Sequence, residues 1–244
     1  MQTQPLSGKS VLITGGARRI GRVIAGALAA AGADVAITYR NSQADAAETL
    51  RVIEGCGRRG LALGCDVRVE NSVSEAVAAA AGHFGRLDLV VNNAAVFEAA
   101  PLESLSVAQW DAVFETNTRG PFLVAREALP HLRATRGKIV NMGSLGGVRP
   151  WAGHAHYCAS KAALHMLTEA MAKAFAPEVS VNCVAPGWIE LGEEPGETAA
   201  RFAAKTPMGR NGSAEDVARA VCFFATSPEF ITGQVLVVDG GLGL

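Results

Sequence analysis

The sequence has little excess charge of either sign, and this shortage excludes several classes of partner. Its 22 lysine and arginine residues nearly balance its 23 aspartate and glutamate residues, which leaves a formal net charge of −1 at pH 7. Nucleic acids and anionic membrane surfaces attract strongly basic patches or tails, so we expect neither as a partner. Long apolar runs are also lacking, since none approaches the roughly 20 residues that cross a bilayer.

Cysteine is scarce as well, and its spacing excludes two further classes. The five cysteines, at positions 56, 65, 158, 183 and 222, show no paired or metal-ligand spacing. We therefore predict reduced thiols, with no disulfide framework and no metal site. Residues 1–5 lack the basic start and apolar core of a signal peptide. Together these features predict a cytoplasmic location.

Seven short apolar segments give the chain its regular organisation. Each is a near-continuous run of the kind that forms a parallel strand buried on both faces, and segments with helical periodicity separate them. This alternation predicts an α/β fold, with a doubly wound, seven-stranded parallel sheet and helices on both faces. No repeat or linker divides residues 1–244, so we expect a single domain. The predicted strands are residues 9–13, 34–38, 61–65, 87–91, 138–141, 180–184 and 234–238.

A glycine-rich turn follows the first predicted strand. Residues 14–21 read T-G-G-A-R-R-I-G and lead directly into a segment with helical periodicity. Glycines between a strand and a helix let a diphosphate approach the backbone at the helix N-terminus. The turn therefore predicts a dinucleotide cofactor.

A tyrosine and a lysine provide the candidate acid–base pair. Tyr157 and Lys161 are four positions apart, so on a helix they share one face. A lysine so placed should lower the tyrosine pKa from its ordinary value of about 10, which makes the phenol a better acid near neutral pH. Ser144 follows the apolar run at 138–142. These side chains suit proton transfer at a carbonyl or alcohol oxygen.

Taken together, these motifs resemble the short-chain dehydrogenase/reductase family over residues 6–241. The family's cofactor turn, T-G-x-x-x-G-x-G, is matched by Thr14, Gly15 and Gly21. Its N-N-A-G segment is matched by residues 92–95, which read N-N-A-A, and its acidic adenine-binding pair by residues 66–67. The resemblance implies a Rossmann-type fold, a nicotinamide cofactor and a catalytic set of Asn117, Ser144, Tyr157 and Lys161.

The resemblance also implies a role for each residue. Tyr157 donates a proton to the substrate, Ser144 polarises the same atom, and Lys161 lowers the tyrosine pKa and holds the nicotinamide ribose. Asn117 is expected to hold a water that links Lys161 to solvent. The implied cofactor residues are Gly15, Arg18, Arg19, Ile20, Gly21, Tyr39, Arg40, Asn41, Ser42, Asp66, Val67, Asn93, Ala94, Ala95, Tyr157, Lys161, Pro186, Gly187 and Ile189.

The end of the second predicted strand indicates which dinucleotide binds. NAD enzymes of this family place an acidic residue there to take the ribose hydroxyls, whereas residues 37–40 read I-T-Y-R. Arg40 can instead accept a 2′-phosphate, and Arg18 is placed to help. We therefore predict NADPH/NADP+ as the cofactor.

Several positions depart from the family pattern. Arg19 replaces the middle glycine of the turn, Phe97 follows the N-N-A-A segment, and residues 39–42 resemble a His-Arg-Ser segment. All three are similar to the pteridine reductase branch. Ser144 is not, since those reductases carry an aspartate there. Leu191 stands where the family usually has a threonine that binds the nicotinamide carboxamide, which predicts a weaker contact.

The function expected from these residues is NADPH-dependent reduction of a carbonyl or imine, with a pterin as one candidate substrate. A general reductase of ketones or 3-oxoacyl thioesters is the alternative. A catalytically idle NADPH-sensing regulator is a third, disfavoured by the intact catalytic set. The resemblance implies a substrate lid near residues 188–208 and a homotetramer or homodimer. The expected substrate residues are Phe97, Ser144, Trp151 and Trp188.

Overall fold

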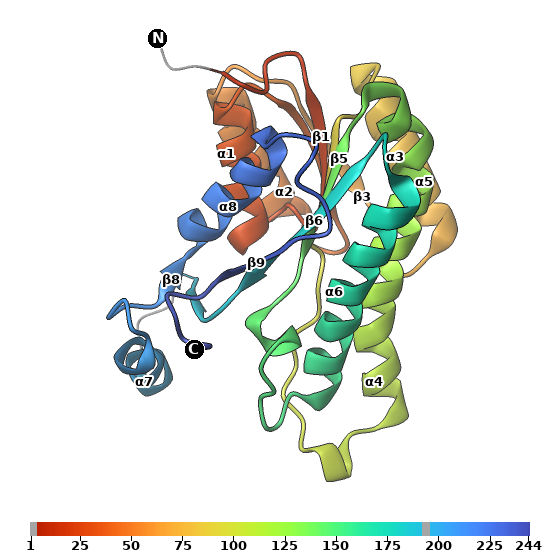
Figure 1. Cartoon of the computed structure of the whole chain (residues 1–244). Coiled ribbons are helices and arrows are strands. Elements are labelled where there is room, and N and C mark those ends of the chain that lie inside the picture. The colour runs from red at the N-terminus through yellow and green to blue at the C-terminus, as the bar shows by residue number, and fades with distance from the viewer. Residues whose placement is uncertain (1–3, 192–195) are drawn as a thin grey trace.

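Helices cover both faces of a central parallel sheet in the computed structural model, which describes residues 4–191 and 196–244 (Figure 1). The sheet has seven strands in the order β3-β2-β1-β4-β5-β6-β9, and each neighbouring pair is parallel. This confirms the predicted fold class, and each predicted strand lies within two residues of its observed bounds. The strands are β1 (Ser10–Thr14), β2 (Asp34–Tyr39), β3 (Gly60–Gly64), β4 (Leu89–Asn92), β5 (Lys138–Met142), β6 (Ser180–Pro186) and β9 (Val235–Val238).

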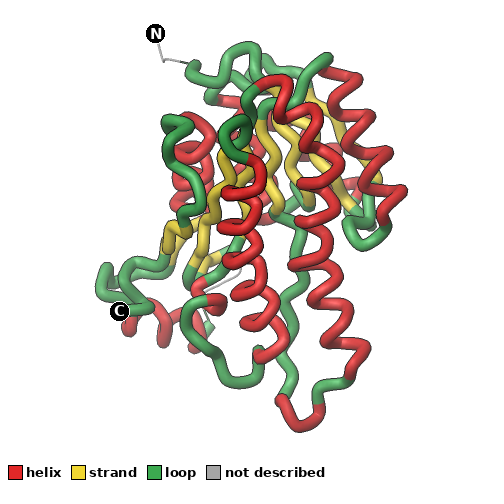
Figure 2. The backbone as a smooth tube through the Cα atoms, turned by 45° about the vertical axis from the view of Figure 1, so that its right-hand side comes forward, coloured by secondary structure: helices red, strands yellow, loops and turns green. Residues whose placement is uncertain are grey.

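Two apolar cores, one on each face of the sheet, attach the helices. The first joins the sheet to α1 and α8 through side chains such as Leu28 and Phe224, and α2 packs against it through Ile53. The second joins the sheet to α3, α5 and α6, and Figure 2 shows long helices running beside the yellow strands. The helices are α1 (Arg19–Ala30), α2 (Gln43–Gly55), α3 (Glu70–Phe84), α5 (Gly120–Thr135), α6 (Ala155–Phe175) and α8 (Ala214–Thr226).

The smaller elements lie beyond the sheet's carboxyl edge or beside it. They include α4 (Val107–Phe114), α7 (Glu197–Lys205), and a two-stranded pair formed by β7 (Ile189–Glu190) and β8 (Gly212–Ser213). Of the lid predicted at 188–208, residues 192–195 lie outside the described part of the chain. The five cysteines are free thiols. Within the described residues, no helix has the length and apolar character to span a membrane.

The strand order reverses beside β1, and this places the site. The chain runs from β1 outward to β3, then crosses back so that β4 pairs with the other side of β1. In a doubly wound sheet, ligands bind in the crevice beyond the carboxyl ends of the strands at such a reversal. The ends of β1, β2, β4, β5 and β6 all meet at that edge.

A buried chain of hydrogen bonds fixes helix α6 against this edge. Asn92 Nδ2 donates to Asn141 Oδ1 at 2.8 Å, and Asn141 Nδ2 donates to Thr168 Oγ1 at 2.9 Å. Buried polar groups need such partners, and in this chain of hydrogen bonds Asn92 Oδ1 is the buried atom that accepts none. The chain therefore sets the position of α6, which carries Tyr157 and Lys161, relative to β4 and β5.

Candidate active site

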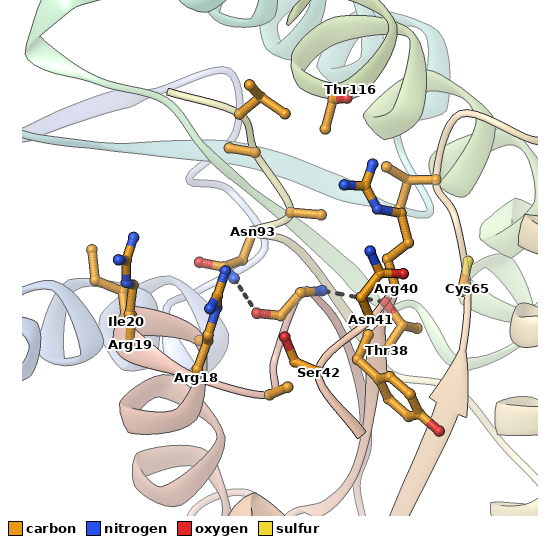
Figure 3. A pocket seen from close by; sticks show the side chains of 18 of the residues that line it. Arg18, Arg19, Ile20, Thr38, Arg40, Asn41, Ser42, Cys65, Asn93 and Thr116 are labelled. Carbon is orange, nitrogen blue, oxygen red and sulfur yellow. Dashed lines mark hydrogen bonds between the residues drawn. The ribbon is translucent and has the colours of Figure 1, made fainter. Parts of the chain in front are cut away.

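Two adjoining cavities lie at the carboxyl edge of the sheet. The first, of about 420 Å³, is lined by the glycine-rich turn and the ends of β1, β2 and β4 (Figure 3). The second, of about 830 Å³, is lined by Ser144, Tyr157 and Lys161 together with the segment after β6. Six residues line both, so the two form one cleft: Arg19, Ile20, Asn93, Ala95, Phe97 and Leu191.

Two glycines of the glycine-rich turn occupy positions where a side chain would not fit. Gly15 has a left-handed φ of 63°, and a Cβ there would lie 2.9 Å from Ala94 Cα. A Cβ on Gly21 would lie 2.4 Å from the Gly15 carbonyl oxygen. Asn93 Nδ2 donates to that same oxygen at 2.9 Å and holds the turn against β4 (Figure 3).

A dinucleotide diphosphate fits this turn. Helix α1 begins at Arg19 with no side-chain cap, so its first backbone N–H groups are available to an anion. Arg18, Arg19 and Arg40 line the same cavity, and their charges suit phosphate oxygens. These residues would hold the phosphates of a nicotinamide dinucleotide, which supplies or accepts a hydride when bound.

Arg19 has an unusual backbone conformation. Its φ is 52°, in the left-handed region that glycine adopts without strain and most other residues avoid. The family turn has a glycine at this position, and the structure shows why that residue suits it. An arginine kept in a strained conformation and lining both cavities is typical of a residue retained for function.

The predicted adenine-binding acid is already engaged. Asp66 lines the first cavity, and its carboxylate accepts hydrogen bonds from Arg68 Nε at 2.9 Å and Nη2 at 2.6 Å. The Arg68 hydrogen bonds, with a smaller contribution from the charge of Arg40, hold the pKa of Asp66 below its ordinary value. The carboxylate is therefore a charged acceptor at the first cavity.

Ser144, Tyr157 and Lys161 come together at the second cavity, as their spacing predicts. Ser144 follows β5, is 3% exposed, and its Oγ accepts a hydrogen bond from the Gly146 backbone at 3.0 Å. Tyr157 and Lys161 lie one turn apart near the start of α6. Lys161 Nζ donates to the Met142 carbonyl oxygen at 2.7 Å, which ties the helix to the end of β5.

The electrostatics of this group correct one expectation. Burial raises the pKa of Tyr157, and its hydrogen bond with Ser144 opposes that rise. Lys161 does not lower the Tyr157 pKa as predicted, because its ammonium donates to the Met142 carbonyl and lies 5.8 Å from the phenol ring centroid. Burial also lowers the pKa of Lys161 itself to about 8. Ser144 is thus the group that favours the phenolate in this structure.

Asn117 is the one predicted site residue that lines neither cavity. It lies in a π-helical turn, Glu115–Arg119, and such turns often occur at functional sites. Its Oδ1 accepts from the Val96 N–H at 2.8 Å, and its Nδ2 donates to the Val96 carbonyl at 3.0 Å and to Ser160 Oγ at 3.1 Å. The side chain therefore joins the loop that carries Phe97 to α6.

Aromatic rings form much of the second cavity's wall. Phe97 is 56% exposed, stacks on His154 at 4.7 Å and meets the Tyr157 ring edge-on at 4.8 Å. Trp151 lies 6.4 Å from the Tyr157 ring, and Trp188 also lines the cavity. His154 belongs to this aromatic group, whereas the neighbouring His156 is fully buried and is not a wall residue.

The sequence prediction includes many, but not all, of the residues that line the cleft. Every predicted cofactor residue and every predicted substrate residue lines one of the two cavities. It missed Phe202 of α7, which stacks on Trp188 at 4.3 Å, because that contact joins segments with no shared motif. Glu190 and Glu197, which place acidic groups along the second cavity, were missed for the same reason.

Comparison with known proteins agrees with this geometry. A protein-family model described as "Enoyl-(Acyl carrier protein) reductase" matches residues 15–243. The chain is 36% identical to 3beta-hydroxysteroid dehydrogenase 1 of Eggerthella lenta, over 98% of this chain and 95% of that protein. It is also 36% identical to a probable tetrahydroxynaphthalene reductase of Zymoseptoria tritici, over 98% and 96%.

A solved structure of a short-chain dehydrogenase is also similar to this chain. The short-chain dehydrogenase of Burkholderia cenocepacia in complex with NADP is 39% identical, with a TM-score of 0.93 over 98% of this chain and all of that one. The fold, the cleft and these relatives define an oxidoreductase that uses a nicotinamide cofactor. The chain belongs to the short-chain dehydrogenase/reductase family.

Replacing Gly21 with alanine is expected to weaken dinucleotide binding by about 5- to 150-fold. The added Cβ would lie 2.4 Å from a backbone oxygen and 2.7 Å from Asn93 Nδ2, and overpacking of this kind costs about 1–3 kcal/mol. Fluorescence titration with NADPH measures the effect. Gly82→Ala on α3 is the matched control, since a Cβ there meets nothing within 4 Å. Parent-like affinity in Gly21→Ala would contradict the assignment of the turn.

Proposed function

We propose that this protein is an NADPH-dependent reductase that converts a ring-bearing carbonyl compound to the alcohol. The observation that carries the proposal is the junction of the two cavities, where the phosphate-binding turn and the Ser144–Tyr157–Lys161 group open into one cleft. A nicotinamide held by the first cavity would then meet a substrate oxygen at the second.

Each catalytic side chain has a distinct task in this proposal. The bound cofactor supplies a hydride to the carbonyl carbon. Tyr157 donates its phenolic proton to the oxygen on which charge develops, and the Ser144 hydroxyl donates a hydrogen bond to the same oxygen. Lys161 would hold the nicotinamide ribose. The raised pKa of Tyr157 keeps the phenol protonated and ready to donate at neutral pH.

Preference for NADPH rests on Arg40 and Arg18, which both line the first cavity at the end of β2 and the start of α1. In Arg40→Asp we expect the ratio of NADPH to NADH affinity to fall by at least about tenfold, because the variant loses a phosphate partner and gains a repelling charge. Arg133→Asp makes the same change of charge on α5, away from the cleft. Retained NADPH preference in Arg40→Asp would refute the role of Arg40.

The substrate class follows from the wall of the second cavity. Phe97 and Trp188 present aromatic surface, and aromatic rings pack favourably against flat apolar molecules. Two relatives are named for a steroid and a tetrahydroxynaphthalene, both of which are fused-ring compounds. A fused-ring or aryl ketone is therefore the first candidate. A pterin is the second, favoured by Arg19 and Phe97, which line both cavities.

The experiment is to follow loss of NADPH absorbance with aryl and fused-ring ketones, a dihydropterin and a 3-oxoacyl thioester in parallel. Turnover concentrated on the ring ketones supports the proposal, and turnover confined to the dihydropterin moves the protein to the pteridine reductase-like branch. Turnover of the thioester alone would show that the aromatic wall does not select the substrate. Tight NADPH binding without turnover of any of them would refute the reductase function and support a sensing role.

We also propose a cytoplasmic location, which five free cysteines support, and a homodimer or homotetramer. Large apolar side chains on α4, α5 and α6 remain solvent-exposed, among them Trp110, Phe122 and Met166. Exposed apolar side chains of this size are common at protein interfaces. Sedimentation analysis would measure the oligomeric state, and a monomer at micromolar concentration would contradict this part of the proposal.

A further inference from the structure

His165 lies directly behind the catalytic serine, and none of the motifs described above assigns it a role. It follows Lys161 by one turn of α6, is 8% exposed, and lines neither cavity. A buried histidine costs stability unless its ring nitrogens find partners. The imidazole of His165 therefore needs a polar partner in the interior, and Ser144 provides one.

The loop that carries Ser144 wraps around the His165 ring. His165 Nε2 accepts a long hydrogen bond, at 3.4 Å, from the Ser144 backbone N–H. A Cβ on Gly143 would lie 2.3 Å from Nε2, and one on Gly147 would lie 2.6 Å from Cε1. Both glycines leave the space that the ring fills, so the imidazole can be neither enlarged nor displaced without moving this loop.

Three successive residues at the end of β5 are held from outside the loop. Lys161 Nζ donates to the Met142 carbonyl at 2.7 Å, the Gly143 N–H donates to the Val184 carbonyl at 2.7 Å, and the Ser144 N–H donates to His165. One turn of α6 thus supplies a donor and an acceptor to the same short segment. We propose, on the basis of the reductase function above, that His165 is a positioning residue that fixes Ser144 for proton transfer at Tyr157.

The charge state of the ring agrees with this role. To accept at Nε2, the imidazole must be neutral with its proton on Nδ1. Burial and the charge of Lys161 lower the pKa of His165 to about 4. The other titratable neighbour at Gly143 is Cys183 of β6, whose pKa burial raises to about 12, and residues 143–147 carry no titratable side chain. The acceptor is therefore neutral throughout the near-neutral range.

The test uses the small number of tyrosines in the chain. There are 2, so a Tyr39→Phe background leaves Tyr157 as the only phenol to titrate by near-ultraviolet absorbance. Ser144 lowers the Tyr157 pKa, so displacing Ser144 should raise it. In His165→Leu we expect a rise of about one pH unit, since one hydrogen bond is worth about that much. His165→Gln keeps an acceptor and should restore the parent value.

A control substitution on α6 and the steady-state kinetics of the His165 variants distinguish a positioning role from a packing role. Glu169→Gln changes an exposed residue one turn further along α6 and should leave the titration unchanged. On a substrate, His165→Leu should lower kcat by about tenfold with KM unchanged, and His165→Gln should recover it. A folded His165→Leu protein with the parent Tyr157 pKa would reduce His165 to a packing residue.

A second measurement uses the parent protein alone, without a variant or a substrate. Nitrogen NMR of histidine-labelled parent protein reports which ring nitrogen carries the proton. The expected result is the Nδ1–H tautomer for His165, neutral down to pH about 4. An Nε2–H tautomer would overturn the proposal. Because the titration and the tautomer are read without turnover, they can fail or succeed separately from the reductase function.

Discussion

Tyr157→Phe is expected to lower kcat by at least about 100-fold while NADPH binds with near-parent affinity. The phenol of Tyr157 lines the second cavity together with Ser144, and burial raises its pKa, so it is protonated and able to donate at neutral pH. General acid catalysis of this kind contributes about 10²- to 10⁴-fold in rate. The substitution removes one oxygen and keeps the ring contacts with Phe97 and Trp151, so the wall of the cavity should be preserved.

Steady-state kinetics and a fluorescence titration with NADPH test this expectation together. A fall in kcat with unchanged NADPH affinity identifies a transition-state role. If turnover persisted at more than about a tenth of the parent value, Tyr157 would not be the proton donor. If affinity for NADPH fell as much as kcat, the phenol would be a cofactor-binding group instead.

Lys161→Met should have two opposite effects: kcat falls by at least about 100-fold, and the free energy of unfolding rises by about 1 kcal/mol or more. The ammonium is 3% exposed, and burial lowers its pKa to about 8, which means that the fold disfavours its charge. Methionine has a similar length and carries no charge. The gain is partly offset, because the Met142 carbonyl loses its donor. The buried ammonium of Lys161 is therefore expected to raise kcat while it lowers the free energy of unfolding.

The pH dependence of the free energy of unfolding provides a second test of the effect of Lys161 on stability. The folded pKa of Lys161 is about 8, below the ordinary 10.5, so between these values the unfolded chain binds more protons. Stability of the parent should therefore rise with pH through that window, and Lys161→Met should lose this component. Lys173→Met, at the exposed end of the same helix, is the control. A less stable Lys161→Met protein, or one with parent activity, would contradict the assignment.

The sequence predicts the sheet well because the signals for parallel strands are local. Runs such as Val11–Ile13 are apolar at every position, and the structure buries them completely. The cofactor turn is equally local, since Gly15 and Gly21 lie within eight residues of each other. The start of α8 is local as well, since Ser213 caps it through a capping box with Asp216. Ser42 occupies the N-cap of α2 without a capping side-chain bond.

Other features depend on contacts between distant segments and could not be predicted in this way. Lys161 is directed to Met142 rather than to the phenol because β5 ends beneath α6, a relation that only the assembled sheet defines. Asn117 uses its side chain on Val96 for a similar reason. The stack of Trp188 on Phe202 and the contact of His165 with Ser144 are likewise set by packing, which spacing along the chain does not encode.

The central claim is that hydride and proton reach one carbonyl group at the junction of the two cavities. The most direct measurement is transfer of deuterium from the reduced nicotinamide ring of labelled NADPH to the product of a ring ketone, followed by mass spectrometry. The account predicts deuterium on the carbinol carbon with the parent protein, and only traces of product with Tyr157→Phe. Alcohol formed without the label, or equal labelled product from both proteins, would contradict it.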